Sequence, residues 1–280
     1  METCVNDYFV LNGRVQESNY FKKEGNNSIC IYEVVRVIEG IPLFLEDHID
    51  RFKNSLKLKN ISIKLNDEEI KQDIELLISK NNVEVGNIRY EWNIKEDVIT
   101  RYAYYIKHYY PNELEYKRGV KLVSYNALRN DPNIKQYHKD LVEKSNELIK
   151  ETGAYEVLLI NNKGFVTEGN KSNIFFVKNN EIYTAPDNMV LEGITRKKII
   201  QIAKDLNIKI RFDAVQYNNI NTFDSAFLTG TSPKVLKICC IDNINFRTEN
   251  EIIEKISYEY DLQINKYISS HKMNKKCTKY

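Results

Sequence analysis

The 280-residue sequence is poor in cysteine and proline and carries almost no net charge. Its five cysteines, at positions 4, 30, 239, 240 and 277, are scattered and form no Cys-x-x-Cys pair. This excludes a disulfide framework and argues against a zinc site; it is typical of reduced thiols in a cytosolic protein. The four histidines do not cluster at metal-ligand spacing either, so we expect no protein-bound metal.

A second group of absences concerns charge and long apolar runs. Forty-one Lys and Arg against 39 Asp and Glu leave a formal charge of +2, too balanced for electrostatic binding of nucleic acid. No apolar run approaches the roughly 18–20 residues that cross a bilayer. The N-terminus lacks the basic and apolar regions of a signal peptide. We therefore expect a cytoplasmic protein without membrane or nucleic-acid partners.

The residues that are present predict a globular two-domain protein. Hydrophobic residues make up 42% and charged residues 29% of the chain, which is globular composition. The length favours two domains. The stretch around 110–120 is polar, non-periodic and contains Pro111, so we interpret it as the linker between a small α/β domain (1–115) and a larger one (120–280).

Strand-like and helix-like patterns alternate along the chain, which predicts an α/β fold. Apolar stripes predict helices from Glu46, from residue 66 or 67, over 139–152, and from Thr195 as the cap. Capping-box spacing at 248–251 predicts a C-terminal helix, followed by a solvated tail over the last ten residues. Strands are expected at 8–11, 29–38, 41–45, twice within 87–109, and at 120–125, 157–160, 173–177, 182–184 and 223–230.

Two segments in the second half have the composition of a phosphate-binding helix start. Gly193 and Thr195 stand where a helix is expected to begin, and the N–H groups of a helix N-terminus bind anions. Gly230 and Thr231 end a strand, and Pro233 suits the first position of a helix. Together the two segments could hold one phosphate, although an ordinary cap explains each one alone. Neither has the form of a nucleoside-triphosphate P-loop.

Three charged residues are candidates for chemistry, although each also has a plain structural explanation. Lys135 follows a turn outside any amphipathic stripe, and Glu168 ends an apolar strand. Arg51 shares a helix face with His48 and Ser55, away from the apolar stripe. Taken singly, each is most simply a solvated or strand-end residue.

Taken together, these segments resemble the class IV aminotransferases, the fold-type IV pyridoxal-phosphate enzymes. That family includes branched-chain-amino-acid and D-amino-acid aminotransferases and aminodeoxychorismate lyase. The resemblance covers about residues 8–245. The matching blocks, in family order, are IYEVVRV (31–37), HIDRF (48–52), IK (134–135), EVLL to VTEG (156–169), SNIF (172–175), LEGITR (191–196) and FLTGT (227–231).

The resemblance implies the two-domain fold of the family, pyridoxal 5'-phosphate as cofactor, and a homodimer. Lys135 would form the Schiff base and move the α-proton, and Glu168 would face the pyridine nitrogen. Tyr32 and Arg89 would line the substrate side. The phosphate would be held by Arg51, Ile194, Thr195, Gly230 and Thr231.

The implied activity is transfer of an amino group between an amino acid, branched-chain or D-, and a 2-oxo acid. The alternatives are 4-amino-4-deoxychorismate lyase, which releases pyruvate, and a non-catalytic pyridoxal-phosphate-binding or scaffold protein. Lys135 together with Glu168 argues against the scaffold. The lyase branch tends to carry threonines where this chain has Glu33 and Val34, so we expect transamination.

Three departures from the family pattern bear on the substrate. Residues 27–30 read Asn-Ser-Ile-Cys in place of a glycine-rich stretch, and His138 replaces a common asparagine. The segment 230–234 reads Gly-Thr-Ser-Pro-Lys in place of Gly-Thr-Ala-Ala-Glu. None removes the lysine, the glutamate or the phosphate ligands.

Overall fold

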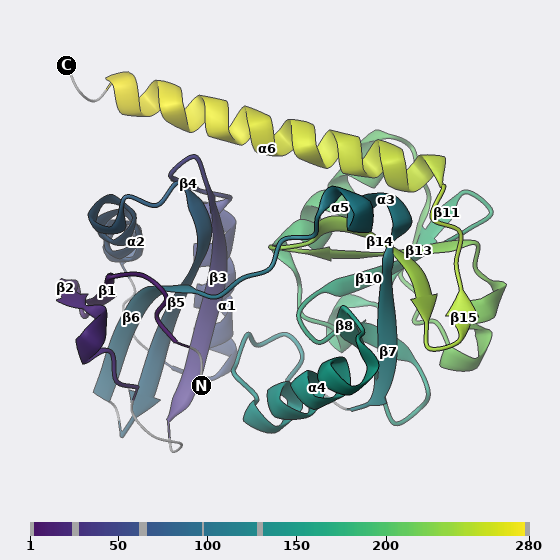
Figure 1. Ribbon diagram of the computed structural model, residues 1–280, viewed down its shortest axis with the longest axis horizontal. Helices are drawn as coiled ribbons and strands as arrows, with labels where there is room; N and C mark the ends of the chain where they lie inside the picture. The colour runs from purple at the N-terminus through teal and green to yellow at the C-terminus, as the bar shows by residue number, and fades with distance from the viewer. Residues whose placement is uncertain (1–2, 24–27, 62–65, 97, 128–130, 278–280) are drawn as a thin grey trace. The chain divides into compact units, whose positions relative to one another are not determined.

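The computed structural model describes residues 3–23, 28–61, 66–96, 98–127 and 131–277; position 27 of the altered segment 27–30 lies outside them. The chain divides into two compact units (Figure 1). Unit 1 comprises residues 1–109, 134–137 and 263–280, and unit 2 comprises 110–133 and 138–262. The division thus differs from the proposed domains 1–115 and 120–280 in three stretches: 134–137 and 263–280 belong to unit 1, and 110–115 belongs to unit 2. The first of these groups with unit 1 because it pairs with a strand there, Tyr32 N donating to Lys135 O at 3.1 Å.

Unit 1 contains a six-stranded antiparallel sheet in the order β2-β1-β6-β5-β3-β4. The strands are β1 (Tyr8–Leu11), β2 (Arg14–Glu17), β3 (Ile29–Ile38), β4 (Ile41–Pro42), β5 (Val85–Lys95) and β6 (Val98–Ile106). A short 3-10 helix spans Ser18–Tyr20. The predicted hairpin turn at Asn12 and Gly13 is confirmed, since both have the positive φ that this turn type requires.

Helices α1 (Leu45–Leu58) and α2 (Asp67–Asn81) pack on one face of this sheet. Their predicted apolar stripes are buried, as amphipathic periodicity requires. The buried members are Ile49, Phe52, Leu56, Ile70, Ile74 and Leu77, which join Ile31, Val35, Ile88, Tyr90 and Trp92 of the sheet in one core. Helix α2 begins at Asp67, one of the two predicted starts, and Asn66 caps it through its side chain.

The opposite face of the same sheet carries charged residues on β5, and these are buried beside an apolar cluster of Phe9, Tyr102 and Tyr104. Successive residues of a strand point to opposite faces, so Arg89 and Glu91 lie on the side away from Ile88 and Tyr90. Arg89 is 1% exposed and Glu91 is 0% exposed. Tyr32 on β3 pairs with Glu91 on β5 and shares this face. A buried face of this composition is a candidate for chemistry rather than for packing.

Unit 2 contains a nine-stranded mixed sheet in the order β12-β11-β10-β13-β14-β7-β8-β9, with β15 beside β14. The neighbours β14-β7, β7-β8 and β11-β12 are parallel and the other pairs antiparallel. The strands are β7 (Val120–Asn126), β8 (Glu156–Ile160), β9 (Val166–Gly169), β10 (Asn173–Lys178), β11 (Glu181–Tyr183), β12 (Ile210–Arg211), β13 (Ser225–Gly230), β14 (Lys234–Ile241) and β15 (Ile244–Asn245).

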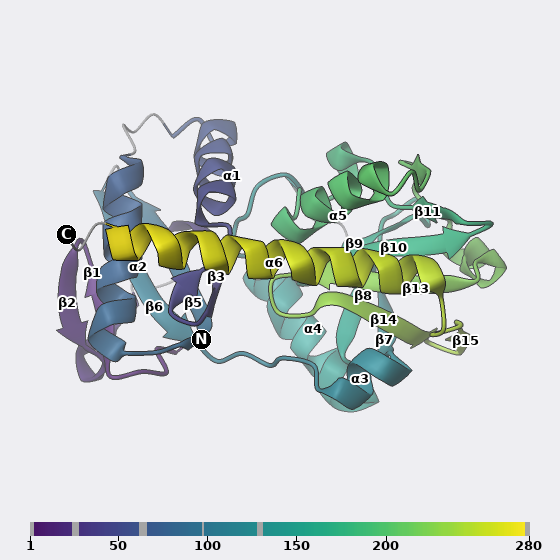
Figure 2. The same cartoon turned by 90° about the horizontal axis from the view of Figure 1, so that it is seen from above.

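The helices of unit 2 include α3 (Glu113–Arg118), α4 (Lys139–Thr152) and α5 (Ile194–Asp205). Short 3-10 helices span Asp187–Met189 and Tyr217–Thr222. The predicted helix 139–152 is confirmed at both ends, with Gly153 in the left-handed conformation after it. The long helix α6 (Glu251–Cys277), yellow in Figures 1 and 2, belongs to unit 2 up to Leu262 and to unit 1 from Gln263.

The predicted strand 41–45 extends only over Ile41–Pro42, because α1 begins at Leu45. Four further local predictions were wrong. The stretch 110–120 is not entirely irregular, because Asn112 and Glu115 form a capping box that starts α3. Pro233 does not begin a helix: Gly230 pairs with Lys234, so residues 231–233 form the turn between β13 and β14. Gly193, and not Thr195, is the cap residue of α5.

The fourth error concerns α6, whose N-terminus is capped by Asn250 and not by Thr248. The Asn250 Oδ1 atom accepts from Ile252 N at 3.0 Å and from Ile253 N at 3.3 Å. The helix then continues to Cys277, so most of the predicted solvated tail is helical. Asn250 was available as a cap in the sequence, and the capping-box spacing drew attention to the wrong residue.

Candidate active site

Lys135 lies in a segment that extends the sheet of unit 1 beside β3. Its carbonyl accepts from Tyr32 N, and Tyr137 N donates to Cys30 O at 3.1 Å. Its own N–H donates to Ser55 Oγ of α1 at 3.2 Å. The Lys135 ammonium lies 4.9 Å from the centroid of the Tyr32 ring. The backbone therefore holds this lysine from two elements, and an aromatic side chain lies beside its amine.

Arg89 lies against the same tyrosine. Its guanidinium carbon is 3.8 Å from the Tyr32 ring centroid, a stacking distance. Tyr32 and Arg89 come from neighbouring strands, and the antiparallel register of β3 and β5 brings them to one face. The structure thus assembles the two predicted substrate residues and Lys135 in one place within unit 1.

Glu91 is the centre of the charged group on this face, and sequence analysis missed it. Its carboxylate accepts from Arg89 Nε, from Lys23 Nζ at 2.8 Å and from Tyr104 Oη at 3.1 Å. Burial alone would raise the pKa of Glu91, but the charges of Arg89 and Lys23 outweigh it and lower that pKa. Two cations share one carboxylate, and the positive charge that remains suits an anionic ligand. The Arg-x-Glu alternation on a strand was the available signal.

Arg51, His48 and Ser55 were most simply explained as a solvated helix face, and that explanation is wrong: all three are buried. Glu33 accepts from Arg51 Nε at 2.7 Å and from Arg51 Nη2 at 2.6 Å. The Nδ1 atom of His48 is 2.7 Å from Glu33 Oε2. The bidentate contact orients the Arg51 guanidinium.

The charge states of this cluster follow from burial and pairing. Burial would raise the pKa of Glu33, but Arg51 and His48 lower it to about 2. Burial lowers the pKa of His48 despite its contact with Glu33. The cluster at neutral pH is therefore an ion pair between Arg51 and Glu33 with a neutral histidine beside it. Ser55 donates to Arg51 O at 3.0 Å, so the serine that accepts from Lys135 N also contacts the arginine backbone.

In unit 2, Glu168 lies at the end of β9 and is 2% exposed. Its Oε2 atom accepts from Leu191 N at 3.0 Å and from Asn173 Nδ2 at 3.1 Å. Asn173 Nδ2 also donates to Leu191 O at 2.9 Å. These contacts fix the carboxylate against the segment that leads into α5, so Glu168 is not an exposed strand-end residue.

The start of α5 carries the predicted residues Ile194 and Thr195, and both are buried. No side chain caps this helix. Its first N–H groups are therefore donors of the kind that bind an anion at a helix N-terminus. A side chain at Gly193 would lie 2.1 Å from Asn173 Oδ1. Any larger residue at position 193 would displace the Asn173 side chain. Asn173 in turn links the helix start to Glu168.

Gly230 and Thr231 lie at the same corner of unit 2. Asn173 on β10 is paired with Thr229 on β13, and a side chain at Gly230 would lie 3.5 Å from Ser172 Cβ. The Thr229 hydroxyl is buried and has no hydrogen-bond partner among the described residues. An uncapped helix start, a Gly-Thr turn and an unsatisfied hydroxyl form a donor set that fits a phosphate group.

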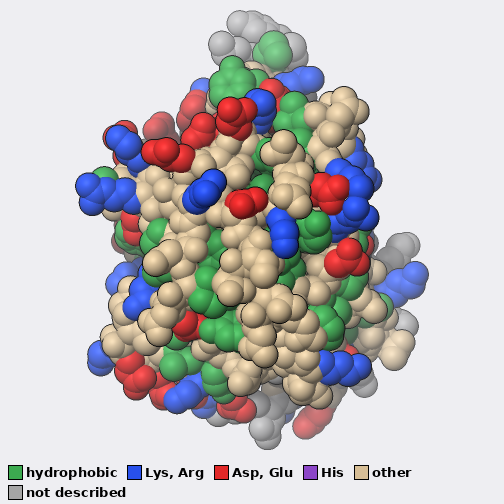
Figure 3. Space-filling view, turned by 90° about the vertical axis from the view of Figure 1, so that its right-hand side faces the viewer, with side chains coloured by type: hydrophobic (Ala, Val, Ile, Leu, Met, Phe, Trp, Pro, Cys, Tyr) green, Lys and Arg blue, Asp and Glu red, His purple; other side chains and the backbone are tan. Residues whose placement is uncertain are grey.

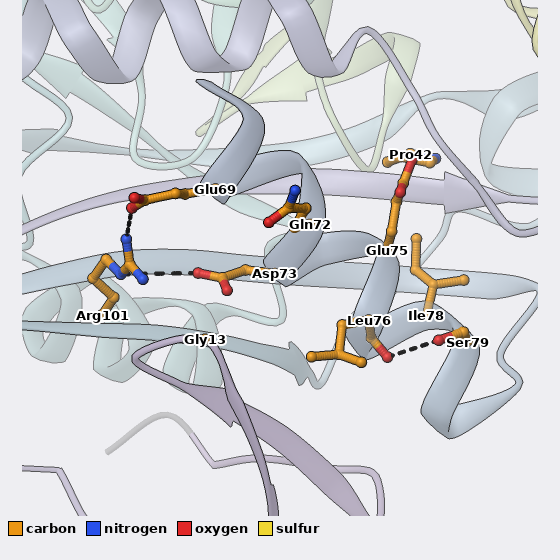
Figure 4. Close-up of a pocket in the computed structure, with 10 residues that line it drawn as sticks. All are labelled: Gly13, Pro42, Glu69, Gln72, Asp73, Glu75, Leu76, Ile78, Ser79 and Arg101. Atoms are coloured by element: carbon orange, nitrogen blue, oxygen red, sulfur yellow. Dashed lines mark hydrogen bonds and ion pairs between the residues drawn. The ribbon is translucent and has the colours of Figure 1, made fainter. Parts of the chain in front are cut away.

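A concavity of about 920 Å³ in unit 1 is lined mainly by residues of α2 (Figure 4). Glu69 and Asp73 point toward Arg101 there. The concavity contains none of the predicted site residues, and α2 packs on the apolar face of the sheet, opposite Tyr32 and Arg89. It is therefore separate from the candidate site.

Three further observations concern metal clusters, surface charge and membrane-spanning helices. Within the described residues, no group of three or more His, Cys, Asp or Glu side chains is arranged to hold a metal ion. Figure 3 shows acidic and basic side chains interspersed on one face of the protein, without a patch of a single sign. Of the helices in the described ranges, none has both the length and the apolarity needed to span a membrane.

Comparison with known proteins identifies the family. The model of the family "Amino-transferase class IV" matches residues 30–241, which include every predicted site residue. The chain belongs to this family. Class IV aminotransferases are pyridoxal-phosphate-dependent enzymes, and the predicted recognition, enzyme class and cofactor are therefore confirmed.

Relatives in different branches of the family are similarly distant. The D-alanine aminotransferase of Bacillus licheniformis is 29% identical over 230 residues, 76% of this chain and 78% of the relative. The aminodeoxychorismate lyase of Bacillus subtilis is 25% identical over 238 residues, 79% of this chain and 80% of the relative. The branched-chain aminotransferase structure from Escherichia coli superposes with a TM-score of 0.81 at 19% identity, covering 92% of this chain and 95% of that one. The fold is thus confirmed, and the branch is not decided by similarity.

Proposed function

We propose that this class IV enzyme is an aminotransferase that moves an amino group between an amino acid and a 2-oxo acid. The observation that supports the proposal is the assembly of Lys135, Tyr32 and Arg89, in which an amine and a guanidinium lie beside one tyrosine ring. A homodimer and a cytoplasmic location are part of this proposal, and they rest on the family resemblance and on the composition.

The cofactor residues that we propose are Lys135, Arg51, Glu168, Ile194, Thr195, Gly230 and Thr231. Pyridoxal phosphate supplies an electron sink for the substrate's α-carbon when it is bound. The ε-amine of Lys135 would hold the cofactor and then move the proton at that carbon. Glu168 would accept from the ring N–H, since a carboxylate favours the protonated form of a neighbouring nitrogen. Arg51 and the N–H groups and hydroxyls of unit 2 would bind the phosphate.

On the substrate side, we propose that Arg89 receives the substrate carboxylate while stacked on Tyr32. The contact between Arg89 and Glu91 orients the guanidinium, and Lys23 offsets the charge of Glu91. A rigid, charged guanidinium loses little freedom when it binds a carboxylate, which favours affinity. An amino acid and a 2-oxo acid share this carboxylate, so one arginine can serve both half-reactions.

The choice of transamination over pyruvate release rests on the strand after Tyr32. Glu33 points to α1, where it is paired with Arg51 and His48, so it is on the opposite face from Tyr32. Val34 shares the face of Tyr32 and lies opposite Arg89 in the register. A valine has no proton to donate or accept, so no hydroxyl at this position can assist the release of pyruvate.

The test is a panel of amino donors, L- and D-, with 2-oxoglutarate and pyruvate as acceptors, run beside aminodeoxychorismate. We expect amino transfer for at least one pair and no steady pyruvate release from aminodeoxychorismate. Val34→Thr is the matched variant, and it should gain pyruvate release if the argument about this position is right. Pyruvate release by the wild type without amino transfer to any acceptor would replace the proposal by the lyase.

Glu168→Gln tests the cofactor half of the proposal, with Glu156→Gln as its control. Glu156 is a second buried glutamate of unit 2, and it accepts from Lys171 N at 2.7 Å and from Ser172 Oγ at 2.9 Å. We expect Glu168→Gln to bind cofactor but to turn over about 10²-fold or more slowly, because an amide does not hold a proton on the ring nitrogen. Equal rates for the Glu168→Gln variant and the wild type would reduce Glu168 to a structural residue.

A further inference from the structure

Two tyrosines of the C-terminal helix α6 hydrogen-bond at the starts of two other helices. In unit 2, Tyr260 Oη is 3.3 Å from Thr195 Oγ1, at the N-terminus of α5. In unit 1, Tyr267 Oη accepts from Leu45 N at 3.2 Å and donates to Glu46 at 2.8 Å, at the N-terminus of α1. The tyrosines are seven residues apart, so they lie on one face of α6.

The first turn of α1 needs a cap that its own sequence does not supply. Phe44 occupies the cap position with φ 52° and has no polar side-chain atom. The Tyr267 hydroxyl accepts from Leu45 N, one of the first N–H groups of the helix, which have no partner within it. The Phe44 and Tyr267 rings pack with their centroids 4.9 Å apart, which holds the hydroxyl in place.

Thr195 lies in the first turn of α5, which no side chain caps. Its side chain is 4% exposed, so its hydroxyl depends on protein partners. Tyr260 is also 4% exposed. The hydrogen bond between these two buried hydroxyls favours one orientation of the Thr195 hydroxyl.

We propose that α6 is a positioning element for the cofactor's phosphate, acting through Tyr260 on Thr195 and through Tyr267 on α1, which carries Arg51. The inference rests on the proposed role of Thr195 and Arg51 in phosphate binding. Neither tyrosine touches the cofactor in this proposal. Each acts by holding a helix start from which a phosphate ligand is presented.

The test compares the affinity of the apoenzyme for pyridoxal phosphate with its affinity for pyridoxal, which lacks the phosphate. The dissociation constant of pyridoxal divided by that of pyridoxal phosphate isolates the phosphate contribution. We expect Tyr260→Phe and Tyr267→Phe each to lower this ratio about three- to tenfold, the effect of one hydrogen bond. Tyr258→Phe is the matched control on the same helix, because that side chain is 64% exposed, and it should leave the ratio unchanged.

Arg51→Ala distinguishes a failure of this inference from a failure of the proposed cofactor site. If the wild type binds pyridoxal as tightly as pyridoxal phosphate, the proposed cofactor site itself fails. If Arg51→Ala abolishes the preference for the phosphate while both tyrosine variants keep it, the site stands and the role of α6 is wrong. Equal weakening of both ligands by the tyrosine variants would show a purely structural contribution and would also overturn the inference.

Discussion

The two faces of the sheet in unit 1 are built from alternate residues of the same strands. One face packs against the helices, and the other carries the charged residues of the candidate site. On β5, Ile88, Tyr90 and Trp92 face α1 and α2 and belong to the core. Arg89 and Glu91, between them, lie on the other face with Tyr32. Phe9, Tyr102 and Tyr104 form an apolar cluster on this second face as well, but this face also buries the charged pair of Arg89 and Glu91 on a single strand.

The difference shows how a two-residue period separates stability from chemistry. A buried apolar side chain stabilises the fold by roughly 1.5–3 kcal/mol. A buried charged pair gives little or no net stability, because desolvation offsets its Coulomb attraction. The charged residues of the second face are therefore poorly explained as stabilising elements and well explained as part of a binding surface.

The largest effect is expected from Lys135→Ala. Removing the amine should lower turnover by about 10²–10⁴-fold or more, while the free energy of unfolding changes little, because the hydrogen bonds of Lys135 to Ser55 and Tyr32 are made by its backbone. Turnover and urea unfolding measure the two quantities. Lys139→Ala, at an exposed lysine of α4, should leave both unchanged; near-normal turnover of Lys135→Ala would remove the lysine from the mechanism.

Neighbouring substitutions on β5 test the comparison directly. Ile88→Ala should lower the free energy of unfolding by about 2–5 kcal/mol, since Ile88 is 0% exposed, and should leave the substrate KM unchanged. Arg89→Lys keeps the charge but loses the stacked, forked geometry, so KM for the amino acid should rise about tenfold with a small change in stability. If both variants change KM alike, the two faces do not have separate roles.

Asp73→Asn tests the cost of a buried charge on α2, which packs on the apolar face of the sheet. Asp73 of α2 is 4% exposed, and its nearest cation, Arg101 Nε, is 4.0 Å away. Burial raises the pKa of Asp73 from 3.8 to about 6. The folded state thus holds the proton more tightly, so the Asp73 carboxylate costs stability above pH 6, by up to about 3 kcal/mol, and the cost disappears as pH falls to 3.8.

Asparagine at position 73 should therefore raise the free energy of unfolding at pH 7 and give no advantage at pH 3.8. Urea unfolding at a series of pH values measures this difference. An advantage that is constant across the series would mean that Asp73 acts through packing and not through its charge. Glu33 provides the contrast, because its pKa is lowered to about 2 by its partners, and it stabilises the fold above its ordinary pKa of 4.5.

Local sequence patterns were sufficient for most of the elements. The stripes of α1 and α2, the Asn12-Gly13 turn and the Gly153 end of α4 follow from periodicity and from backbone conformation, which are properties of neighbouring residues. The errors at Thr195 and Pro233 arose where a glycine, threonine or proline suits both a turn and a helix start. Strand pairing across β13 and β14 decided the second case.

The candidate site was partly accessible in the same way. The family resemblance named Lys135, Glu168, Arg51, Tyr32 and Arg89. Nothing local indicated that Arg51 is buried against Glu33 or that Glu91 joins Lys23 to Arg89. Lys23 and Glu91 are far apart in the chain, and their contact depends on which face each residue occupies.

The sequence by itself determined the α/β pattern, the family and the residue types available for chemistry, because these depend on short-range periodicity and on motif order. Only the tertiary structure decided which charged residues are buried and which partner each one has. Burial and pairing fix the charge state of Glu33, His48 and Glu91, and they depend on contacts between residues that the chain brings together only by folding.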